Sequence, residues 1–315
     1  MLPVVYSDYK IAEQIVEDPS TAPIPNLHKA MFAWVKKFTR NSWDLTASDI
    51  QTLRDVGIAD SEIGVWAQFA AAQSVFVMMG DGGGVTLDDG NEVGAVVGRD
   101  RPTYNQAEGG LLASAPGSAG NTVNAAENMV AWIVTDEACA DFQPAAVWAK
   151  KRYGFVPNLL KSISSDPIAS QNMMSAFELL EAPQSETLSP RQHALVRALV
   201  SDLNRCAYSA VTTRALLQQF KDGDGLYEKV TGPWNPDDWN QNDRLVLSFA
   251  IKTARNAYKI VESDAQEFRD AGLGDEGYVD VLNTVALQTA YDRMANSLGV
   301  VADDSPVLTV KLSAA

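Results

Sequence analysis

Residues 188–213 read LSPRQHALVRALVSDLNRCAYSAVTT, which predicts one helix, a break, and a second helix with Cys206 near its start. Asn204 is of a type that favours the N-cap position, so we expect Cys206 in the first turn, where unpaired amides and the helix dipole favour a thiolate. At 3.6 residues per turn, Cys206, Ser209 and Thr213 share one side of this helix. The stretch therefore predicts a small polar cluster around a reactive sulfur.

Three segments resemble the AhpD-like, or carboxymuconolactone decarboxylase-like, family of all-helical thiol peroxidases. The segment RYGFVPNLL, residues 152–160, resembles the family's entry segment, and Leu188-Ser189 with residues 201–208 resembles its catalytic helix pair. The resemblance covers about residues 145 to 300. It implies an all-α helical bundle, a cysteine nucleophile and a hydroperoxide as substrate. We expect no cofactor.

The catalytic pattern of that family is only partly present. Its peroxidases carry Glu, then Cys-x-x-Cys, then His seven residues after the first Cys. Cys206 matches the first cysteine, but Ser209 stands at the second, Thr213 at the histidine and Ala194 at the glutamate. A resolving thiol turns a sulfenic acid into a disulfide and restores the enzyme, and Ser209 cannot do this.

Two neighbouring side chains are alternative proton carriers. His193 lies next to Ala194 and could supply a base from a shifted angle, although a lone histidine beside an apolar stripe is more often packed or solvated. Tyr208 could donate a proton to a leaving hydroxide, and an aromatic residue at this spacing is equally a core-filling residue. Cys206, Tyr208, His193, Ser209 and Thr213 are therefore the candidate catalytic residues.

Composition excludes several classes of function. The chain has 315 residues, 46% hydrophobic content and no run of eighteen apolar residues, so we expect no membrane span. A net charge of -15 repels nucleic-acid backbones and anionic lipids. Two histidines and two cysteines, Cys139 and Cys206, without metal-ligand spacing predict no metal site and no disulfide scaffold, although a disulfide between these two stays open. The N-terminus lacks a secretory signal pattern, so we expect a cytoplasmic protein.

An internal repeat appears when the sequence is compared with itself. Residues 28–85 align with residues 243–300 without a gap. The matching pairs are Lys37/Lys252, Arg40/Arg255, Asn41/Asn256, Ser48/Ser263, Asp49/Asp264, Gln51/Gln266, Arg54/Arg269, Asp55/Asp270, Gly57/Gly272, Asp60/Asp275, Ala71/Ala286, Gln73/Gln288, Met79/Met294, Gly84/Gly299 and Val85/Val300. The pattern predicts long helix, short helix, long helix, with Ser48 and Ser263 starting the short helices and Gly57 and Gly272 ending them. The two copies are expected to pack about an internal pseudo-twofold axis.

These observations define an expected organisation. Residues 1–85 form an N-terminal helical half unit, residues 86–123 a glycine-rich connector, and residues 124–315 a complete AhpD-like domain. Strand-like alternation is limited to Val93–Val97 and Pro306–Lys311, so any sheet would be marginal. The expected fold is therefore an all-α AhpD-like bundle, one complete unit plus a half-unit repeat.

Two functions of different classes follow from the sequence. The first is a peroxidase-related oxidoreductase in antioxidant defence, in which Cys206 reduces a hydroperoxide and an external thiol reductant regenerates it. The second is a catalytically silent module for assembly or for binding a small apolar ligand, with Cys206 kept as a small core residue. Decarboxylation of a lactone acid, which the family's other name implies, lacks a placed general acid. We expect a homo-oligomer that binds neither nucleic acid nor membrane.

Overall fold

The fold is built from helices throughout residues 9–85, 130–181, 186–223 and 225–304, the part of the chain that the computed structural model describes. The helices are α2 (Tyr9–Glu17), α3 (Asn26–Asn41), η1 (Ser42–Asp44), α4 (Ala47–Asp55), α5 (Asp60–Gly82), η2 (Ala140–Phe142), α6 (Gln143–Tyr153), α7 (Asn158–Lys161), α8 (Pro167–Glu181), α9 (Pro190–Leu203), α10 (Ala207–Leu217), α11 (Leu226–Thr231), η3 (Pro236–Asp238), α12 (Gln241–Asn256), η4 (Ala257–Lys259), α13 (Glu262–Asp270) and α14 (Gly274–Leu298). The all-α fold class expected from the sequence is confirmed.

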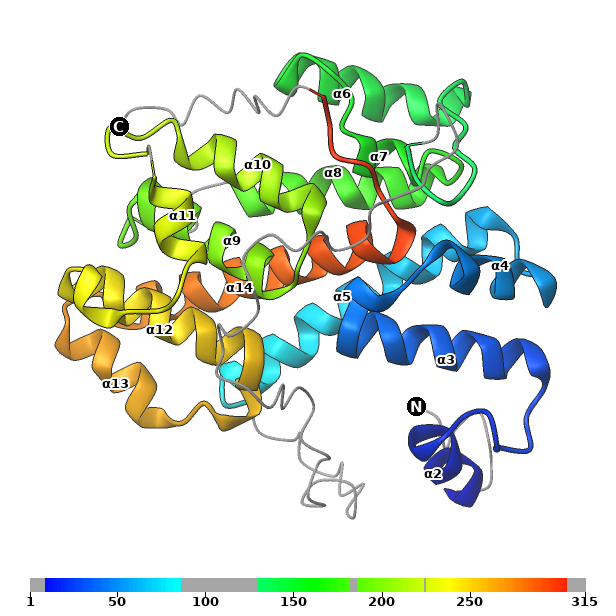
Figure 1. Cartoon of the computed structure of the whole chain (residues 1–315), viewed down its shortest axis with the longest axis horizontal. Helices are drawn as coiled ribbons and strands as arrows, with labels where there is room; N and C mark the ends of the chain where they lie inside the picture. The colour runs from blue at the N-terminus through cyan, green and yellow to red at the C-terminus, as the bar shows by residue number, and fades with distance from the viewer. Residues whose placement is uncertain (1–8, 86–129, 182–185, 224, 305–315) are drawn as a thin grey trace.

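Helices α5 and α14 form the centre of the bundle (Figure 1). They run antiparallel, since the last residue of α5, Gly82, lies against the first half of α14, where the Tyr278 hydroxyl donates to the Gly82 carbonyl. A Cβ on Gly82 would lie 2.4 Å from Leu282 Cδ1. Glycine at this position therefore permits the close crossing of the two helices.

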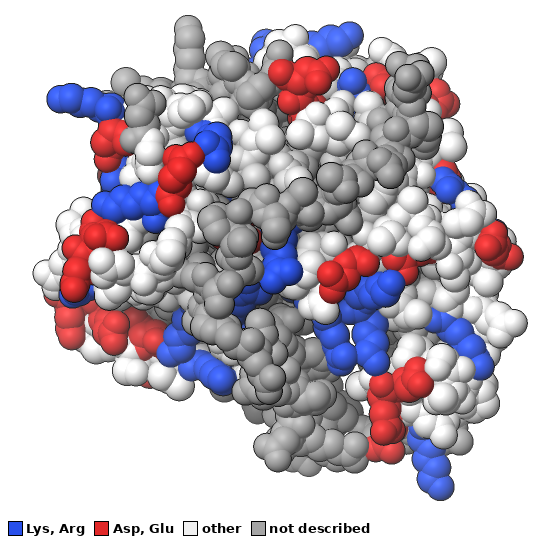
Figure 2. Space-filling model, in the orientation of Figure 1, with Lys and Arg blue, Asp and Glu red and all other residues white. Residues whose placement is uncertain are grey.

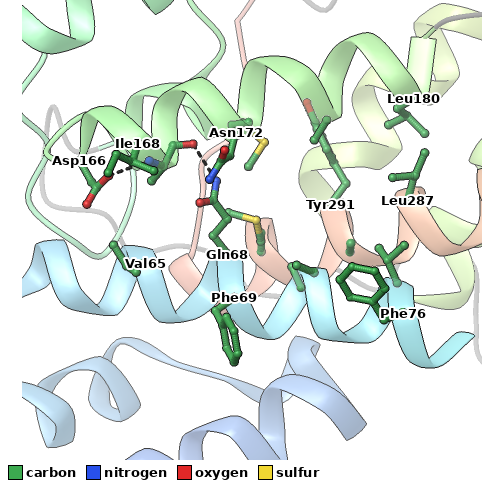
Figure 3. Close-up of a pocket in the computed structure, with 18 residues that line it drawn as sticks. Val65, Gln68, Phe69, Phe76, Asp166, Ile168, Asn172, Leu180, Leu287 and Tyr291 are labelled. Atoms are coloured by element: carbon green, nitrogen blue, oxygen red, sulfur yellow. Dashed lines mark hydrogen bonds between the residues drawn. The ribbon is translucent and has the colours of Figure 1, made fainter. Parts of the chain in front are cut away.

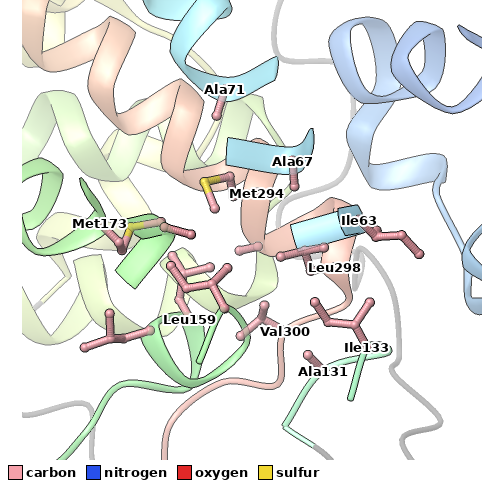
Figure 4. Packing of buried hydrophobic residues seen from close by; sticks show 14 of the residues in the cluster. Ile63, Ala67, Ala71, Ala131, Ile133, Leu159, Met173, Met294, Leu298 and Val300 are labelled. Carbon is pink, nitrogen blue, oxygen red and sulfur yellow. The ribbon is translucent and has the colours of Figure 1, made fainter. Parts of the chain in front are cut away.

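The main hydrophobic core fills the space beside this crossing. Figure 4 shows Ala67 of α5 and Met294 and Leu298 of α14 packed with Leu159 and Met173 from the green helices. A second core lies among α9, α12, α13 and α14. The segment with Cys206 joins α9 and α10, and both of these helices pack against α14.

The two repeat segments have matching helix bounds. Helices α3, η1 and α4 begin and end at the positions that align with the first and last residues of α12, η4 and α13. The ion pair Lys37–Asp49, 2.6 Å, corresponds to Lys252–Asp264, also 2.6 Å. These local features agree with the alignment, while the superposition of the two segments about a pseudo-twofold axis stays a prediction.

The predicted starts of the short helices are wrong by one to two residues. Asp49 Oδ2 accepts the Thr46 amide at 2.9 Å, and Asp264 Oδ2 accepts the Val261 amide at 2.7 Å, so carboxylates in the first turn cap both helices instead of Ser48 and Ser263. The predicted ends are confirmed, because the two glycines that follow α4 and α13 have φ of +93° and +78°.

Helix α5 also has the length and composition of a membrane-spanning helix, the one such case among the residues the structure describes. Its packing against α14 gives it a second explanation as a core helix of the bundle.

Acidic and basic side chains are interspersed on the face shown in Figure 2. The cytoplasmic location and the absence of nucleic-acid and membrane partners stay predictions. The 86–123 connector and both candidate strands lie outside the described residues.

Candidate functional site

Cys206 lies at the junction of α9 and α10. It is the N-cap residue of α10, with φ of -92° and ψ of 101°. Asn204, predicted to be this N-cap, is instead the C-cap of α9, and Arg205 makes the sharp turn between the helices with φ of +49°. The cysteine is therefore at a helix start as predicted, but at the cap position and not inside the first turn.

The Cys206 sulfur is buried, with 1% of the residue exposed. Its thiol donates to Ser209 Oγ at 3.5 Å, and the backbone amides of Tyr208 and Ser209 also point toward the sulfur. Burial raises the pKa of the thiol far above its usual value, and the nearby Asp292 carboxylate raises it further. The expected activated thiolate is therefore not favoured in the folded protein, because loss of solvent outweighs the amide contacts.

A buried polar network from α14 adjoins this junction. Asp292 is fully buried and accepts hydrogen bonds from Asn204 Nδ2 at 2.9 Å and Gln288 Nε2 at 2.8 Å. The Ser209 hydroxyl also bonds to Asp292. Burial raises the pKa of Asp292 to about 6. A chain of polar groups thus runs from the Cys206 thiol through a hydroxyl to a carboxylate.

Asp292 was missed by the sequence reasoning. The repeat alignment gave no signal for it, because the equivalent residue of the first segment is Val77. The available signal was its position four residues after Gln288, which places both polar side chains on one face of α14. Arg197 Nε donates to Gln288 Oε1 at 3.0 Å and ties the same network to α9.

His193 faces α14 and not the Cys206 junction. Its Nε2 lies 3.0 Å from Asp280 Oδ2, and its Nδ1 lies 3.2 Å from Thr284 Oγ1. Ten residues of α9 separate it from Leu203 at the helix end, a rise of about 15 Å. The structure therefore places His193 too far along α9 to serve as the base for the sulfur.

The hydroxyl groups of Tyr208 and Thr213 are hydrogen-bonded to acceptors other than the sulfur. The Tyr208 hydroxyl donates to Asp303 Oδ2 at 2.8 Å, and burial raises the pKa of Tyr208 well above its usual value. Its ring lies 6.2 Å from that of Tyr291 in the core. Thr213 is fully buried and donates to the Ser209 carbonyl at 2.8 Å. Of the candidate residues, Ser209 is the one whose side chain is hydrogen-bonded to the Cys206 sulfur.

The two cysteines are free thiols, so the disulfide left open by the sequence is not formed. Within the described ranges, no group of three or more His, Cys, Asp or Glu residues is placed to hold a metal ion. The fold also contains a recess whose lining residues do not include Cys206. It has a volume of about 560 Å³ and opens between α5, α8 and α14.

This recess, which we call the α5/α8 cavity, is lined by 18 mostly apolar residues (Figure 3). Gln68, Asp166 and Asn172 gather at one end, while Leu287 and Phe76 lie toward the other. Gln68 Nε2 donates to the Ala169 carbonyl at 2.7 Å, and Asp166 Oδ1 accepts the Ala169 amide at 2.6 Å. The cavity therefore has a long apolar wall and one polar end.

Comparisons with known proteins show the fold. No family model matches the chain, and no curated protein matches it. A solved structure of an uncharacterized peroxidase-related protein from Silicibacter sp. TM1040 aligns with a TM-score of 0.51 at 22% identity, covering 58% of this chain and 96% of that one. An alkylhydroperoxidase AhpD core, an uncharacterized peroxidase-related protein from Ralstonia eutropha JMP134, aligns with a TM-score of 0.50 at 22% identity, covering 57% and 95%. The AhpD-like fold expected from the sequence is confirmed, at the level of the fold.

Proposed function

We propose that this chain is an AhpD-fold protein that binds an apolar small molecule in the α5/α8 cavity and has lost the dithiol reaction. The observation that carries this proposal is the cavity of about 560 Å³, a size typical of small-molecule sites. Its walls come from α5, α8 and α14, so the N-terminal half unit contributes directly to the site. Cys206 is absent from the lining residues.

The chemistry of the walls narrows the ligand class. The apolar wall favours an alkyl or ring system, and the amides of Gln68 and Asn172 can hydrogen-bond a polar end group. The Asp166 carboxylate at the same end, in a chain of net charge -15, disfavours a carboxylate on the ligand. We therefore propose an elongated apolar molecule with an uncharged or cationic end.

Competition binding tests this proposal. The neutral dye N-phenyl-1-naphthylamine should gain fluorescence with the full chain, and dodecanol or dodecylamine should displace it at lower concentration than dodecanoate. Ala176→Phe fills the cavity from α8 and should weaken dye binding at least tenfold. Ala33→Phe, on the exposed side of α3, is the matched control and should bind as the unchanged chain does. Equal binding by the Ala176→Phe chain would contradict the proposal.

A second function is supported by one observation, the chain of groups from Cys206 through Ser209 to Asp292. If the junction opened, Asp292 could accept the thiol proton. The thiolate would then attack a hydroperoxide, forming an S–O bond and breaking the O–O bond, and the protonated Asp292 would give its proton to the leaving alkoxide, releasing an alcohol. Two equivalents of an external thiol would reduce the sulfenic acid, giving a disulfide and water. This is one-cysteine peroxidase chemistry in antioxidant defence.

Measuring peroxide consumption distinguishes the ligand-binding function from the peroxidase function. With dithiothreitol and cumene hydroperoxide, the binding proposal predicts equal rates for the unchanged chain and for Cys206→Ser. A rate that falls to background in Cys206→Ser, and that also falls in Asp292→Asn, would favour the peroxidase.

A further inference from the structure

Helix α5 carries an apolar stripe on its outer side. Phe69, Phe76 and Val77 are 59%, 71% and 56% exposed, and Val65 and Gln73 extend the same side of the helix. Isolated exposed apolar residues are ordinary, but a row of them on one helix face indicates an interaction surface. We call residues Val65, Phe69, Gln73, Phe76 and Val77 the α5 stripe.

The corresponding positions of α14 are covered. In the repeat alignment, Val65, Phe69, Gln73 and Val77 correspond to Asp280, Thr284, Gln288 and Asp292. All four of these α14 residues are buried, and α9 covers them through its contacts with His193, Arg197 and Ser201. No helix of the described residues covers the α5 stripe in this way.

The side chains of the α5 stripe and of the four aligned α14 residues differ in polarity, so the two sets need different kinds of partner surface. The four α14 residues are polar and match polar side chains of α9 and of its C-cap residue Asn204. The α5 stripe is apolar apart from Gln73, so an α9-like polar helix would leave its own polar groups without partners there. An apolar partner surface is therefore complementary to the α5 stripe.

The charge pattern and the central glutamine favour a second copy of this chain. Helix α5 has no charged residue between Glu62 and Asp81, so two copies with a net charge of -15 each can meet here without placing like charges together. In an antiparallel pairing with the twofold axis at Gln73, Phe69 lies opposite the second copy's Val77. The two Gln73 side chains can then exchange amide hydrogen bonds, because each amide holds a donor and an acceptor.

We propose that two copies of this chain dimerise through the α5 stripe. A Phe side chain has about 150–250 Å² of surface, so the stripe with the exposed Ile168 of α8 offers roughly 500 Å² per copy. Burial of about 1,000 Å² in total is at the lower limit for a specific interface, so the dimer is weak and depends on concentration. Because Phe69 and Phe76 also line the α5/α8 cavity, dimerisation closes its open side.

Sedimentation velocity of the full chain tests the dimer. Between about 1 and 100 µM, the range in which weak dimers of this size dissociate, the mass should rise from 34.0 kDa toward twice that value. Val77→Asp and Phe69→Asp should each remain monomeric, because the pairing would bury each new carboxylate against an apolar side chain of the second copy. Val147→Asp, at a 64% exposed position of α6, is the matched control and should dimerise normally. Circular dichroism confirms that each variant is folded.

A cross-link provides an independent measurement. Gln73→Cys in a Cys139→Ser background should form a disulfide-linked dimer under mild oxidation, since Cys206 is buried. A wild-type chain that stays monomeric throughout, aspartate variants that still dimerise, or no cross-link would each overturn the proposal. Binding of the monomer to neutral lipid vesicles that is lost in Val77→Asp would also overturn it, by assigning the stripe to a membrane.

This inference does not depend on the cavity being occupied. Val77 does not line the cavity, so Val77→Asp should still bind the dye when it is monomeric. A chain that dimerises normally but does not bind the dye would contradict only the proposed function. A chain that stays monomeric but binds the dye would contradict only the proposed dimer.

Discussion

Two opposing effects act on the Cys206 sulfur. The amides at the start of α10 and the Ser209 hydroxyl stabilise a negative charge, while burial and the Asp292 carboxylate oppose it. Burial has the larger effect, because a charge removed from water loses more solvation than three weak donors to sulfur restore. At the residue scale, the thiol is therefore a protonated core group.

Thiol labelling tests this statement. In the native protein, iodoacetamide at about pH 8 should modify the half-buried Cys139 and leave Cys206 unmodified, as peptide mass spectrometry would show. In urea both should react. Native labelling of Cys206 as fast as in urea would contradict the assignment of a buried, protonated thiol.

Asp292 makes folding dependent on pH. Its pKa rises from 3.8 in the unfolded chain to about 6 in the folded protein because of burial. The stability that this shift contributes is complete below about pH 4 and is lost as the pH rises through about 6. At about 1.4 kcal/mol per pKa unit, the difference in unfolding free energy between the unchanged chain and Asp292→Asn should fall by on the order of 2 kcal/mol from pH 4 to 7. Urea unfolding at several pH values measures it, and a constant difference would contradict this prediction.

At the scale of elements, the sequence predicted the helices better than their first residues. The glycines Gly57 and Gly272 marked helix ends correctly, since only glycine adopts their backbone conformation without strain. The serine starts failed because Asp49 and Asp264 can reach the free amides themselves and compete with serine. Such competition depends on side-chain geometry that spacing alone does not fix.

The repeat supplies a matched pair of glycines for a stability test. Gly84 and Gly299 are equivalent in the repeat alignment and have φ of +63° and +59°. A Cβ on Gly84 meets nothing within 4 Å, whereas one on Gly299 would lie 2.1 Å from the Trp132 ring. Gly84→Ala should cost about 1 kcal/mol from backbone strain, and Gly299→Ala about 1–3 kcal/mol more from the clash. Equal losses in urea unfolding would show that Trp132 does not pack there as described.

At the scale of the whole molecule, the sequence predicted the helical fold and the helix start at Cys206, but not the cavity. The segments that line it, around Phe69, Ile168 and Leu287, are far apart in the chain. No local pattern indicates that three helices will leave space between them. For the Asp292 network, the spacing of Gln288 and Asp292 on α14 was a local signal, whereas the partner from the end of α9, Asn204, could not be predicted from spacing.

The central claim is that the α5/α8 cavity, and not the Cys206 junction, is the functional site. The most direct measurement is photolabelling with a dodecanol analogue that carries an alkyl diazirine, followed by peptide mass spectrometry. The account predicts labels on residues 65–76, 168–180 and 287–294 that disappear in Ala176→Phe. Labels elsewhere, or labels unaffected by that substitution, would contradict it.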